Sequence, residues 1–135
     1  MSKSEHAVIA AAQKKMVDTH NELIGDNQNV YTATGSVNVA MIVFGGTLDA
    51  SLDFSSGEKK SYDGSFGGAG IGGGTSNGTA AFSIPPGKLN GKMSFQLTVG
   101  ANVVVKWYIN GIIVGTFVGD SVKGGGEFGG SGEWS

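Results

Sequence analysis

The 135-residue chain contains no cysteine and no arginine, and it has only two prolines and two histidines. Without cysteine there is neither a disulfide framework nor a thiolate zinc site. All nine basic residues are lysines and the formal net charge is -2, whereas nucleic-acid binding relies on clustered basic residues that release counterions. These absences exclude a disulfide-stabilised scaffold and argue against DNA or RNA as the partner.

Long hydrophobic runs are also missing. No apolar stretch approaches the roughly 18 residues that a transmembrane helix needs. The N-terminus carries only the short apolar run 7–12 where a signal peptide would have its core. The sequence therefore predicts a soluble protein without a transmembrane segment, which either stays in the cytoplasm or leaves the cell by a leaderless route.

Glycine and small polar residues take the place of the missing charge. Charged residues make up 15% of the chain and 25 positions are glycine, whereas charged residues usually account for about 25%. Seven Phe, three Tyr and two Trp supply anchors for a core, which distinguishes the chain from a disordered one. The length fits one domain, and we expect it to be a monomer.

The N-terminal segment has the pattern of a helix over residues 3–24. Ser2 and Glu5 form a capping box, and Gly25 is a typical stop residue. A narrow apolar stripe recurs at a spacing near four, made of Val8, Ala12, Met16, Thr19 and Leu23. We assign residues 1–28 to this helix and a linker.

From residue 30 onward the hydrophobic period changes to two, which is typical of half-buried strands. Turns are predicted at Gly45-Gly46, Asn77-Gly78 and Asn110-Gly111, and a break at Pro85-Pro86. Residues 67–74 are expected to be irregular or to form a poorly specified strand, because six of them are glycine. The expected strands cover residues 37–44, 47–54, 61–66, 79–84, 93–99, 103–109 and 112–118, and the stretches 121–128 and 130–134 can complete the sheet.

Short strands without intervening helices favour a sandwich or a barrel. Glycine within strands allows the sharp bends and close backbone approaches of a small barrel. Closure also removes the exposed edges that such a sheet would otherwise present. The sequence therefore predicts a mainly β fold: a small closed antiparallel β-barrel of seven to eight strands over residues 29–135, preceded by one helix.

A G-x-G-x-x-G match over residues 68–73 raises the question of a dinucleotide site. Such a loop needs a helix after it to direct backbone amides at the phosphates, and the sequence Gly-Thr-Ser-Asn-Gly-Thr that follows from Gly74 does not form one. A chance match in a glycine-rich chain is the preferred interpretation. Asn77-Gly78-Thr79 is similarly a formal glycosylation sequon that also reads as a turn.

No metal site or catalytic set is predicted. The two histidines, His6 and His20, lie about 21 Å apart on the predicted helix and cannot share a metal. Asp49 and Asp53 lie about 13 Å apart along one strand face, too far to act as a carboxylate pair. Four further acidic residues have no spacing that requires them to meet, and we expect them to cap turns and aid solubility: Asp63, Asp120, Glu127 and Glu133.

The aromatic residues of the C-terminal half divide into core and surface positions. Trp107 is in phase with the apolar face of its strand, so we expect it in the core rather than in a sugar-binding platform. Tyr108 and Trp134 are predicted to be the exposed aromatics, and they are the candidate binding residues. No cofactor is expected.

Several short motifs recur in a characteristic order along the β portion. They are the stretches 62–68 (Tyr-Asp-Gly-Ser-Phe-Gly-Gly), 78–79, 93–96 (Met-Ser-Phe-Gln), 113–119 and the closing Gly-Gly-Ser-Gly-Glu-Trp-Ser of 129–135. In these motifs the chain resembles the virulence-associated protein (Vap) family of secreted bacterial proteins. It departs from the family in its predicted helix, where the family has a long disordered segment, and in lacking a signal peptide.

The resemblance implies an eight-stranded antiparallel barrel with a filled interior and no catalytic residues. It also implies a role in host interaction, with survival inside phagocytes and effects on endolysosomal membranes. We therefore expect a non-enzymatic bacterial interaction protein, in its specific form a secreted antigen or host-interaction factor, whose partner is a protein, a glycan or a membrane surface. The alternative is a small-ligand or carbohydrate-binding barrel, which requires an interior that side chains leave open. An enzyme that uses the acidic residues is the third hypothesis.

Overall fold

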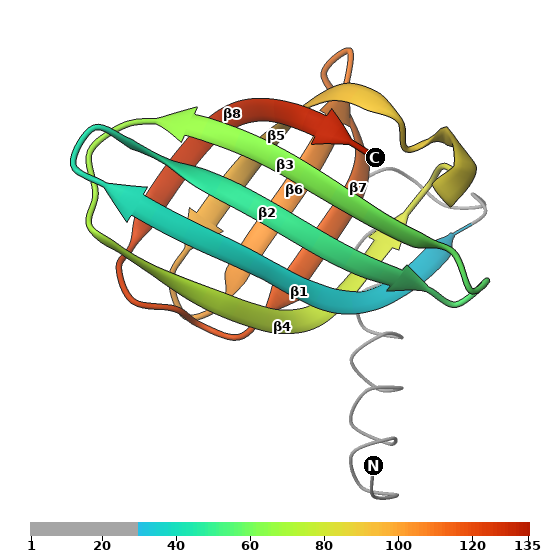
Figure 1. Cartoon of the computed structure of the whole chain (residues 1–135), viewed down its shortest axis with the longest axis horizontal. Coiled ribbons are helices and arrows are strands. Elements are labelled where there is room, and N and C mark those ends of the chain that lie inside the picture. Colours follow the sequence, from blue (N-terminus) through green and yellow to red (C-terminus); the bar gives the residue numbers. More distant parts are fainter. Residues whose placement is uncertain (1–29) are drawn as a thin grey trace, which may run out of the picture.

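The computed structural model describes residues 30–135, which form one closed barrel of eight antiparallel strands (Figure 1). Neighbouring strands follow the order β1-β2-β3-β8-β5-β6-β7-β4, and β4 closes the ring against β1. The predicted barrel is confirmed, with eight strands. The predicted helix over residues 3–24 lies outside the described residues. The strands are β1 (Tyr31–Ile42), β2 (Gly45–Phe54), β3 (Lys59–Gly67), β4 (Gly72–Phe82), β5 (Gly91–Val99), β6 (Val103–Ile109), β7 (Ile112–Gly119) and β8 (Gly126–Trp134).

The alternation of apolar and polar residues sets the register of the strands. On β2 every second residue from Leu48 to Phe54 is buried, and the residues between them are exposed. Val37 on β1 lies opposite Ala50 on β2, so both strands turn their apolar residues inward. A slip by one residue would expose the whole apolar set of a strand, which is why the pattern fixes the pairing.

Two of the predicted boundaries are wrong. The first hairpin turns at residues 43–44 rather than at Gly45-Gly46, since Ile42 pairs with Gly45. The last strand begins at Gly126, after a connection over residues 120–125. The glycine-rich segment 67–74 contains both of the structures considered for it, because residues 68–71 form a connection and residues 72–74 belong to strand β4.

Asn77-Gly78 is not a turn but the middle of β4, where Asn77 pairs with Ser36 and Gly78 with Gly35. The glycine is needed for a different reason than the one predicted. A Cβ at Gly78 would lie 2.1 Å from the carbonyl oxygen of Val118 on β7. Glycine at this position therefore permits close approach of two backbones.

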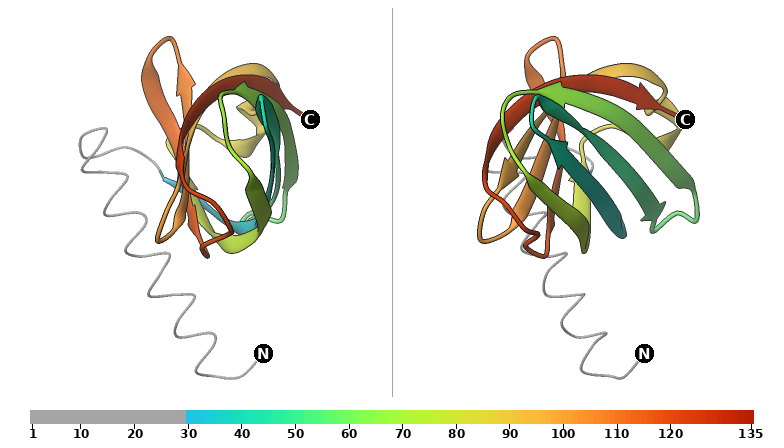
Figure 2. Two further views of the ribbon diagram at one scale, coloured as in Figure 1. Left: turned by 90° about the vertical axis from the view of Figure 1, so that its left-hand side faces the viewer. Right: turned by 60° about the vertical axis from the view of Figure 1, so that its left-hand side comes forward.

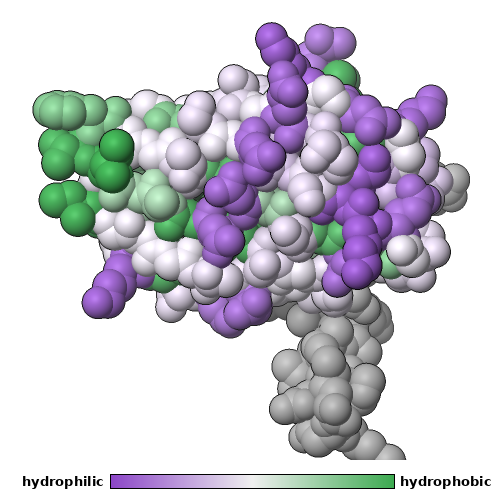
Figure 3. Space-filling view, in the orientation of Figure 1, coloured by the Kyte–Doolittle hydropathy of each residue, from purple (hydrophilic) through white to green (hydrophobic). Residues whose placement is uncertain are grey.

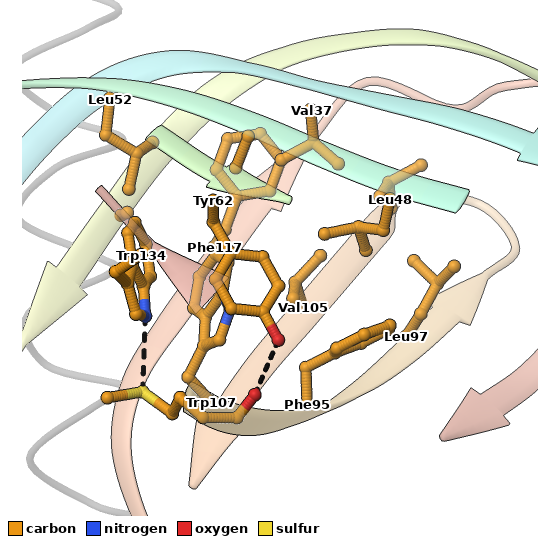
Figure 4. Close-up of a cluster of buried hydrophobic side chains, with 14 of the residues drawn as sticks. Val37, Leu48, Leu52, Tyr62, Phe95, Leu97, Val105, Trp107, Phe117 and Trp134 are labelled. Atoms are coloured by element: carbon orange, nitrogen blue, oxygen red, sulfur yellow. Dashed lines mark hydrogen bonds between the residues drawn. The ribbon is translucent and has the colours of Figure 1, made fainter. Parts of the chain in front are cut away.

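The interior is filled by side chains, and aromatic rings form its centre (Figure 4). Tyr62 contacts Phe95, Trp107 and Trp134, with ring centroids 4.9–5.8 Å apart. The Tyr62 hydroxyl donates a 2.6 Å hydrogen bond to the Met93 carbonyl oxygen, and burial raises the pKa of this phenol. The packed rings leave a core rather than a ligand-holding lumen.

Trp134 was predicted to be an exposed aromatic, and that prediction is wrong. Its side chain is 3% exposed, and its indole Nε1 donates to the Met93 sulfur at 3.3 Å. The last strand β8 lies between β3 and β5, so Trp134 faces the barrel centre opposite Tyr62. Trp107 is fully buried, as predicted.

The barrel has two distinct ends, because antiparallel strands place alternate connections on opposite sides (Figure 2). One end carries the connections 43–44, 68–71, 100–102 and 120–125. The opposite end carries the connections 55–58, 83–90 and 110–111, together with the start of β1 and the end of β8. At this second end a backbone hydrogen bond joins Ser135 to Ser61.

Candidate functional site

Four large apolar side chains are exposed together at the first of these ends. They are Ile42 (71% exposed), Val43 (53%), Phe44 (88%) and Ile71 (78%). We refer to these four residues as the apolar tip. Figure 3 shows apolar side chains gathered at this end of the molecule, at the left of the view.

The register of the sheet brings the two parts of the apolar tip together. Gly45, which directly follows Phe44, pairs with Gly67 on β3, four residues before Ile71. On the other side, Met41 pairs with Gly72, the residue after Ile71. The β1–β2 turn and the β3–β4 connection therefore lie side by side, as the left of Figure 1 also shows.

The end that carries the apolar tip is nearly free of charge. Among its four connections the only charged residues are Asp120 and Lys123, which are of opposite sign. Lys123 is exposed, and its backbone forms an isolated bridge with Gly73. The opposite end carries more charge, with Glu58, Lys59, Lys60 and Lys88, although Ile109 and Ile112 are also exposed there.

The turn at the apolar tip departs from ordinary hairpin chemistry. Two-residue turns favour residues with positive φ, such as the pair Asn110-Gly111 at the other end, where φ is 51° and 78°. Val43 and Phe44 fill the equivalent place, although among residues 30–135 Asn110 is the only non-glycine residue with positive φ. Large apolar residues in a solvent-facing turn satisfy no local rule, and such departures are expected at functional or strained positions.

One pattern in the sequence indicates this site, but the predicted position of the turn assigned its residues to a strand. Residues 39–44 (Val-Ala-Met-Ile-Val-Phe) are six consecutive apolar residues, and Ile42, Val43 and Phe44 are the last three of them. Such a run is out of place on a strand with one solvent face. The turn was predicted at the Gly-Gly pair that follows, two residues too far along the chain, and Val43 and Phe44 were therefore assigned to a strand.

The glycine-rich loop contributes to the apolar tip and has no context for binding phosphate. Residues 68–71 connect β3 directly to β4, so the G-x-G-x-x-G match is followed by a strand and not by a helix. A dinucleotide site requires the helix N-terminus that is missing here. The residue that this loop contributes to the apolar tip is Ile71.

The acidic residues form a row on the outer wall of the barrel. Asp49 lies opposite Asp63, and Asp63 lies opposite Glu133, which in turn lies opposite Lys92. Burial, followed by the hydrogen bond and the charge of Asp63, raises the pKa of the Asp49 carboxyl. Asp53 pairs with Lys59 instead, while Asp120 lies in the β7–β8 connection and Glu127 pairs with Thr98 on β5.

The acidic row gives no grounds for metal chemistry. Within residues 30–135, no group of three or more His, Cys, Asp or Glu side chains is arranged to hold a metal ion. All three acidic residues of the row are exposed on the sheet rather than enclosed in a cleft. His6 and His20 lie outside the described part of the chain.

Of the two candidate binding aromatics, only Tyr108 reaches the surface. Its side chain is half-buried on the outer wall, and its hydroxyl donates to the Gln96 Oε1 at 3.1 Å. Trp134 lies inside the barrel and is 3% exposed, so it offers no ring face to a ligand. The structure does not bring these two aromatics together into one surface.

No family model matches the chain, and no curated protein matches it. Solved structures that share its fold include two virulence-associated proteins. The virulence-associated protein VapD from the intracellular pathogen Rhodococcus equi has a TM-score of 0.66 and 17% sequence identity, with 82% of this chain and 100% of VapD covered. The virulence-associated protein VapB from the same organism has a TM-score of 0.61 and 24% identity, with 81% of this chain and 98% of VapB covered.

The fold is therefore that of the Vap proteins, and the resemblance inferred from the motif order is confirmed at the level of the fold. The common part corresponds to nearly the whole length of both neighbours. In the described portion, none of the helical structure has the length and hydrophobicity that crossing a membrane requires.

Proposed function

We propose that this chain is a non-enzymatic, virulence-associated interaction protein that docks its apolar tip onto a phospholipid membrane of the host. The observation that carries the proposal is the apolar tip itself, two adjacent connections that expose four large apolar side chains at an almost uncharged end. The shared fold with two virulence-associated proteins supports the biological setting.

The physical chemistry of the apolar tip suits a lipid surface. Full burial of a Val, Ile or Phe side chain contributes about 1.5–3 kcal/mol, and these four side chains are between half and nine-tenths exposed. The gross gain is therefore about 1–2 kcal/mol for each side chain that enters the acyl region. Summed over the four side chains, this gain gives reversible attachment to the membrane, comparable with that of a single acyl chain.

The size of the tip argues against a stable protein interface as its main use. A standard protein–protein interface buries about 800 Å² on each partner, and four side chains on two narrow connections offer less. A bilayer sets no minimum area, because each side chain that leaves water contributes on its own. The filled interior also gives no support to the small-ligand alternative.

Flotation of the full chain with liposomes tests the proposal. We expect the protein to float with both neutral phosphatidylcholine and anionic vesicles, because the four connections at this end carry only one lysine and one aspartate. We expect little change between about pH 5 and pH 7, because none of the four tip side chains titrates. Phe44→Ser and Ile71→Ser should each lower the membrane partition coefficient by roughly tenfold. The fraction of protein that floats should fall accordingly.

Ile112→Ser is the matched control, because Ile112 is 65% exposed and lies at the opposite end of the barrel. This variant should float as the unmodified protein does. Equal loss in Phe44→Ser and Ile112→Ser would indicate nonspecific adsorption. No flotation with either lipid would refute the membrane as the partner.

A further inference from the structure

The barrel consists of two four-stranded sheets that part from each other at the apolar tip. One sheet contains β4, β1, β2 and β3, and the other contains β8, β5, β6 and β7. Across the two seams between them, β3 pairs with β8 over residues 62–66 and β4 pairs with β7 over residues 78–82. Both ladders end before the apolar tip, and the β1–β2 turn and the β3–β4 connection project past the other sheet at the left of Figure 1. We refer to the gap between residues 68–77 and residues 120–129 as the mouth.

Hydrogen bonds cross the mouth at two levels. Next to the ladder of β4 and β7, the Asp120 amide donates to the Asn77 carbonyl oxygen at 3.1 Å. The Ser76 hydroxyl donates to the Asp120 carbonyl oxygen at 2.7 Å. Closer to the tip, the Gly73 amide donates to the Lys123 carbonyl oxygen at 2.9 Å, in a bridge that is isolated from any ladder. The tip side of the mouth is therefore held less firmly than a continuous ladder would hold it.

The segments on both sides of the mouth are rich in glycine. Five of residues 68–74 and all of residues 124–126 are glycine. Positive φ occurs at Gly68, Gly72, Gly73, Gly74, Gly124 and Gly126. Glycine gains more conformational freedom than any other residue when it leaves an ordered conformation. Segments of this composition therefore open at a low cost in free energy.

A second apolar layer lies directly beneath these glycines. A Cβ at Gly70 would lie 3.4 Å from both the Met41 Sδ and the Phe128 Cζ, so the backbone at Gly70 packs on these two side chains. The centroids of the Phe128 and Phe66 rings are 4.9 Å apart. Met41 directly precedes Ile42, the first residue of the apolar tip. We refer to Met41, Phe66 and Phe128 as the inner layer, which continues the apolar tip into the barrel.

We propose that the mouth opens when the apolar tip enters a membrane and that the inner layer then contacts the lipid acyl chains. The inference rests on the proposed membrane docking and adds a second set of lipid contacts to it. In water the inner layer is only 6–8% exposed, and opening would expose its apolar side chains at a cost. Acyl chains are as apolar as the core, so the membrane largely removes this cost. A lipid surface therefore shifts the equilibrium towards the open mouth, because it binds the open form better.

Stiffening the mouth tests the proposal without changing the apolar tip or the inner layer. Gly70→Ala and Gly125→Ala each add a methyl group at a position without positive φ. At both positions the new Cβ would lie at an ordinary contact distance, 3.4 Å or more from the nearest atom. Alanine restricts the freedom that glycine gains on opening, so the closed mouth is favoured. Each substitution should lower the partition coefficient for phosphatidylcholine vesicles by about two- to fivefold.

The matched control is Gly100→Ala, in the β5–β6 connection at the same end, where a Cβ meets no atom within 4 Å. It adds the same methyl group outside the mouth and should leave the partition coefficient unchanged or slightly raised. A rigid mouth predicts this result for all three variants, so unchanged or increased partitioning of Gly70→Ala and Gly125→Ala would overturn the proposal. Circular dichroism verifies that each variant is folded, and two positions are used so that one misfolded variant does not end the test.

Tryptophan reporters then show which layer meets the lipid. Brominated phosphatidylcholine quenches tryptophan fluorescence on contact, and Trp107 and Trp134 are buried in the core and supply the baseline. We expect quenching well above this baseline for Phe44→Trp, in the apolar tip, and for Phe128→Trp, in the inner layer. Added to these reporters, Gly70→Ala should reduce the quenching per bound molecule only for Phe128→Trp.

The two reporters separate failure of the mouth from failure of the docking. Quenching of Phe44→Trp with only baseline quenching of Phe128→Trp would support the docking and overturn the opening of the mouth. Baseline quenching of both would refute the docking, and the opening with it. Phe66→Trp is a second reporter of the inner layer, and it decides the outcome if Phe128→Trp does not fold.

Discussion

The packing of rings around Gly115 offers the sharpest test of the core. Gly115 on β7 lies opposite both Phe82 and Trp107. A Cβ at this position would lie 2.1 Å from the Phe82 Cε2. The ring has no free side to move to, because its centroid is 5.4 Å from Trp107, 5.5 Å from Phe54 and 5.7 Å from Trp134.

Gly115→Ala should therefore destabilise the barrel strongly. Overpacking of a rigid core costs about 1–3 kcal/mol, and we expect a loss of about 3 kcal/mol here because the displaced group is an aromatic ring enclosed by three others. The corresponding fall in Tm is roughly 10–20 °C. Urea unfolding monitored by tryptophan fluorescence is a suitable assay, since both tryptophans are buried and respond to loss of the core.

Two companion variants make this result decisive. Gly67→Ala is the control, because a Cβ at Gly67 meets no atom within 4 Å. Adding Phe82→Leu to Gly115→Ala should recover part of the loss, so that the pair costs at least about 1 kcal/mol less than the two single changes together. Equal stability of Gly115→Ala and Gly67→Ala, or strict additivity with Phe82→Leu, would refute the reasoning.

Three further predictions concern single hydrogen bonds, turns and charges. Tyr62→Phe removes the hydrogen bond to the buried Met93 carbonyl oxygen and should cost about 1–2 kcal/mol in urea unfolding, whereas an unchanged midpoint would contradict the role of that bond. Asn110 has positive φ, so Asn110→Ala should cost about 1 kcal/mol while Asn110→Gly is tolerated, and thermal melts of the two variants compare these effects. The pKa of Asp49 is raised by burial and by Asp63, so the folded chain keeps this proton to a higher pH than the unfolded chain does. The associated stability is present below about pH 4 and is lost as the pH rises through the folded value. Asp49→Asn should make the free energy of unfolding depend less on pH and should raise it at neutral pH by roughly 0.2–1 kcal/mol. Thermal melts at a series of pH values measure this, and a variant whose stability fell more steeply with rising pH than that of the unmodified protein would contradict the prediction.

The barrel could be predicted from the sequence because its strands obey one simple rule. The alternation in β5 and β6 assigns Phe95, Leu97 and Trp107 to the interior, and the structure places them there. Asn110-Gly111 forms the predicted turn because its side chains suit positive φ. These features depend on neighbours in sequence, which is why a single sequence reveals them.

The errors arise where partners distant in sequence decide the outcome. Asn77-Gly78 has turn composition, but Gly78 is required by the approach of β7, forty residues further along the chain. Trp134 is flanked by polar residues, yet β8 is inserted between β3 and β5, and this buries it beside Tyr62. Periodicity carries no information about such pairings.

The candidate site was missed for a related reason. Ile71 and Phe44 belong to separate connections, and only the closed strand order places those connections side by side. Each residue alone is an ordinary exposed apolar side chain, which needs no explanation. Their combination becomes visible only when the ends of the barrel are compared.

The position of β8 between β3 and β5 governs how the chain can fold during its synthesis. While the ribosome is still adding this strand, the nascent chain has two unsealed edges, one on β3 and one on β5. Unpaired edges of this kind attract other strands. The ring therefore closes only after translation has passed Trp134, and until then the edges of β3 and β5 are both open to pairing with strands of other chains.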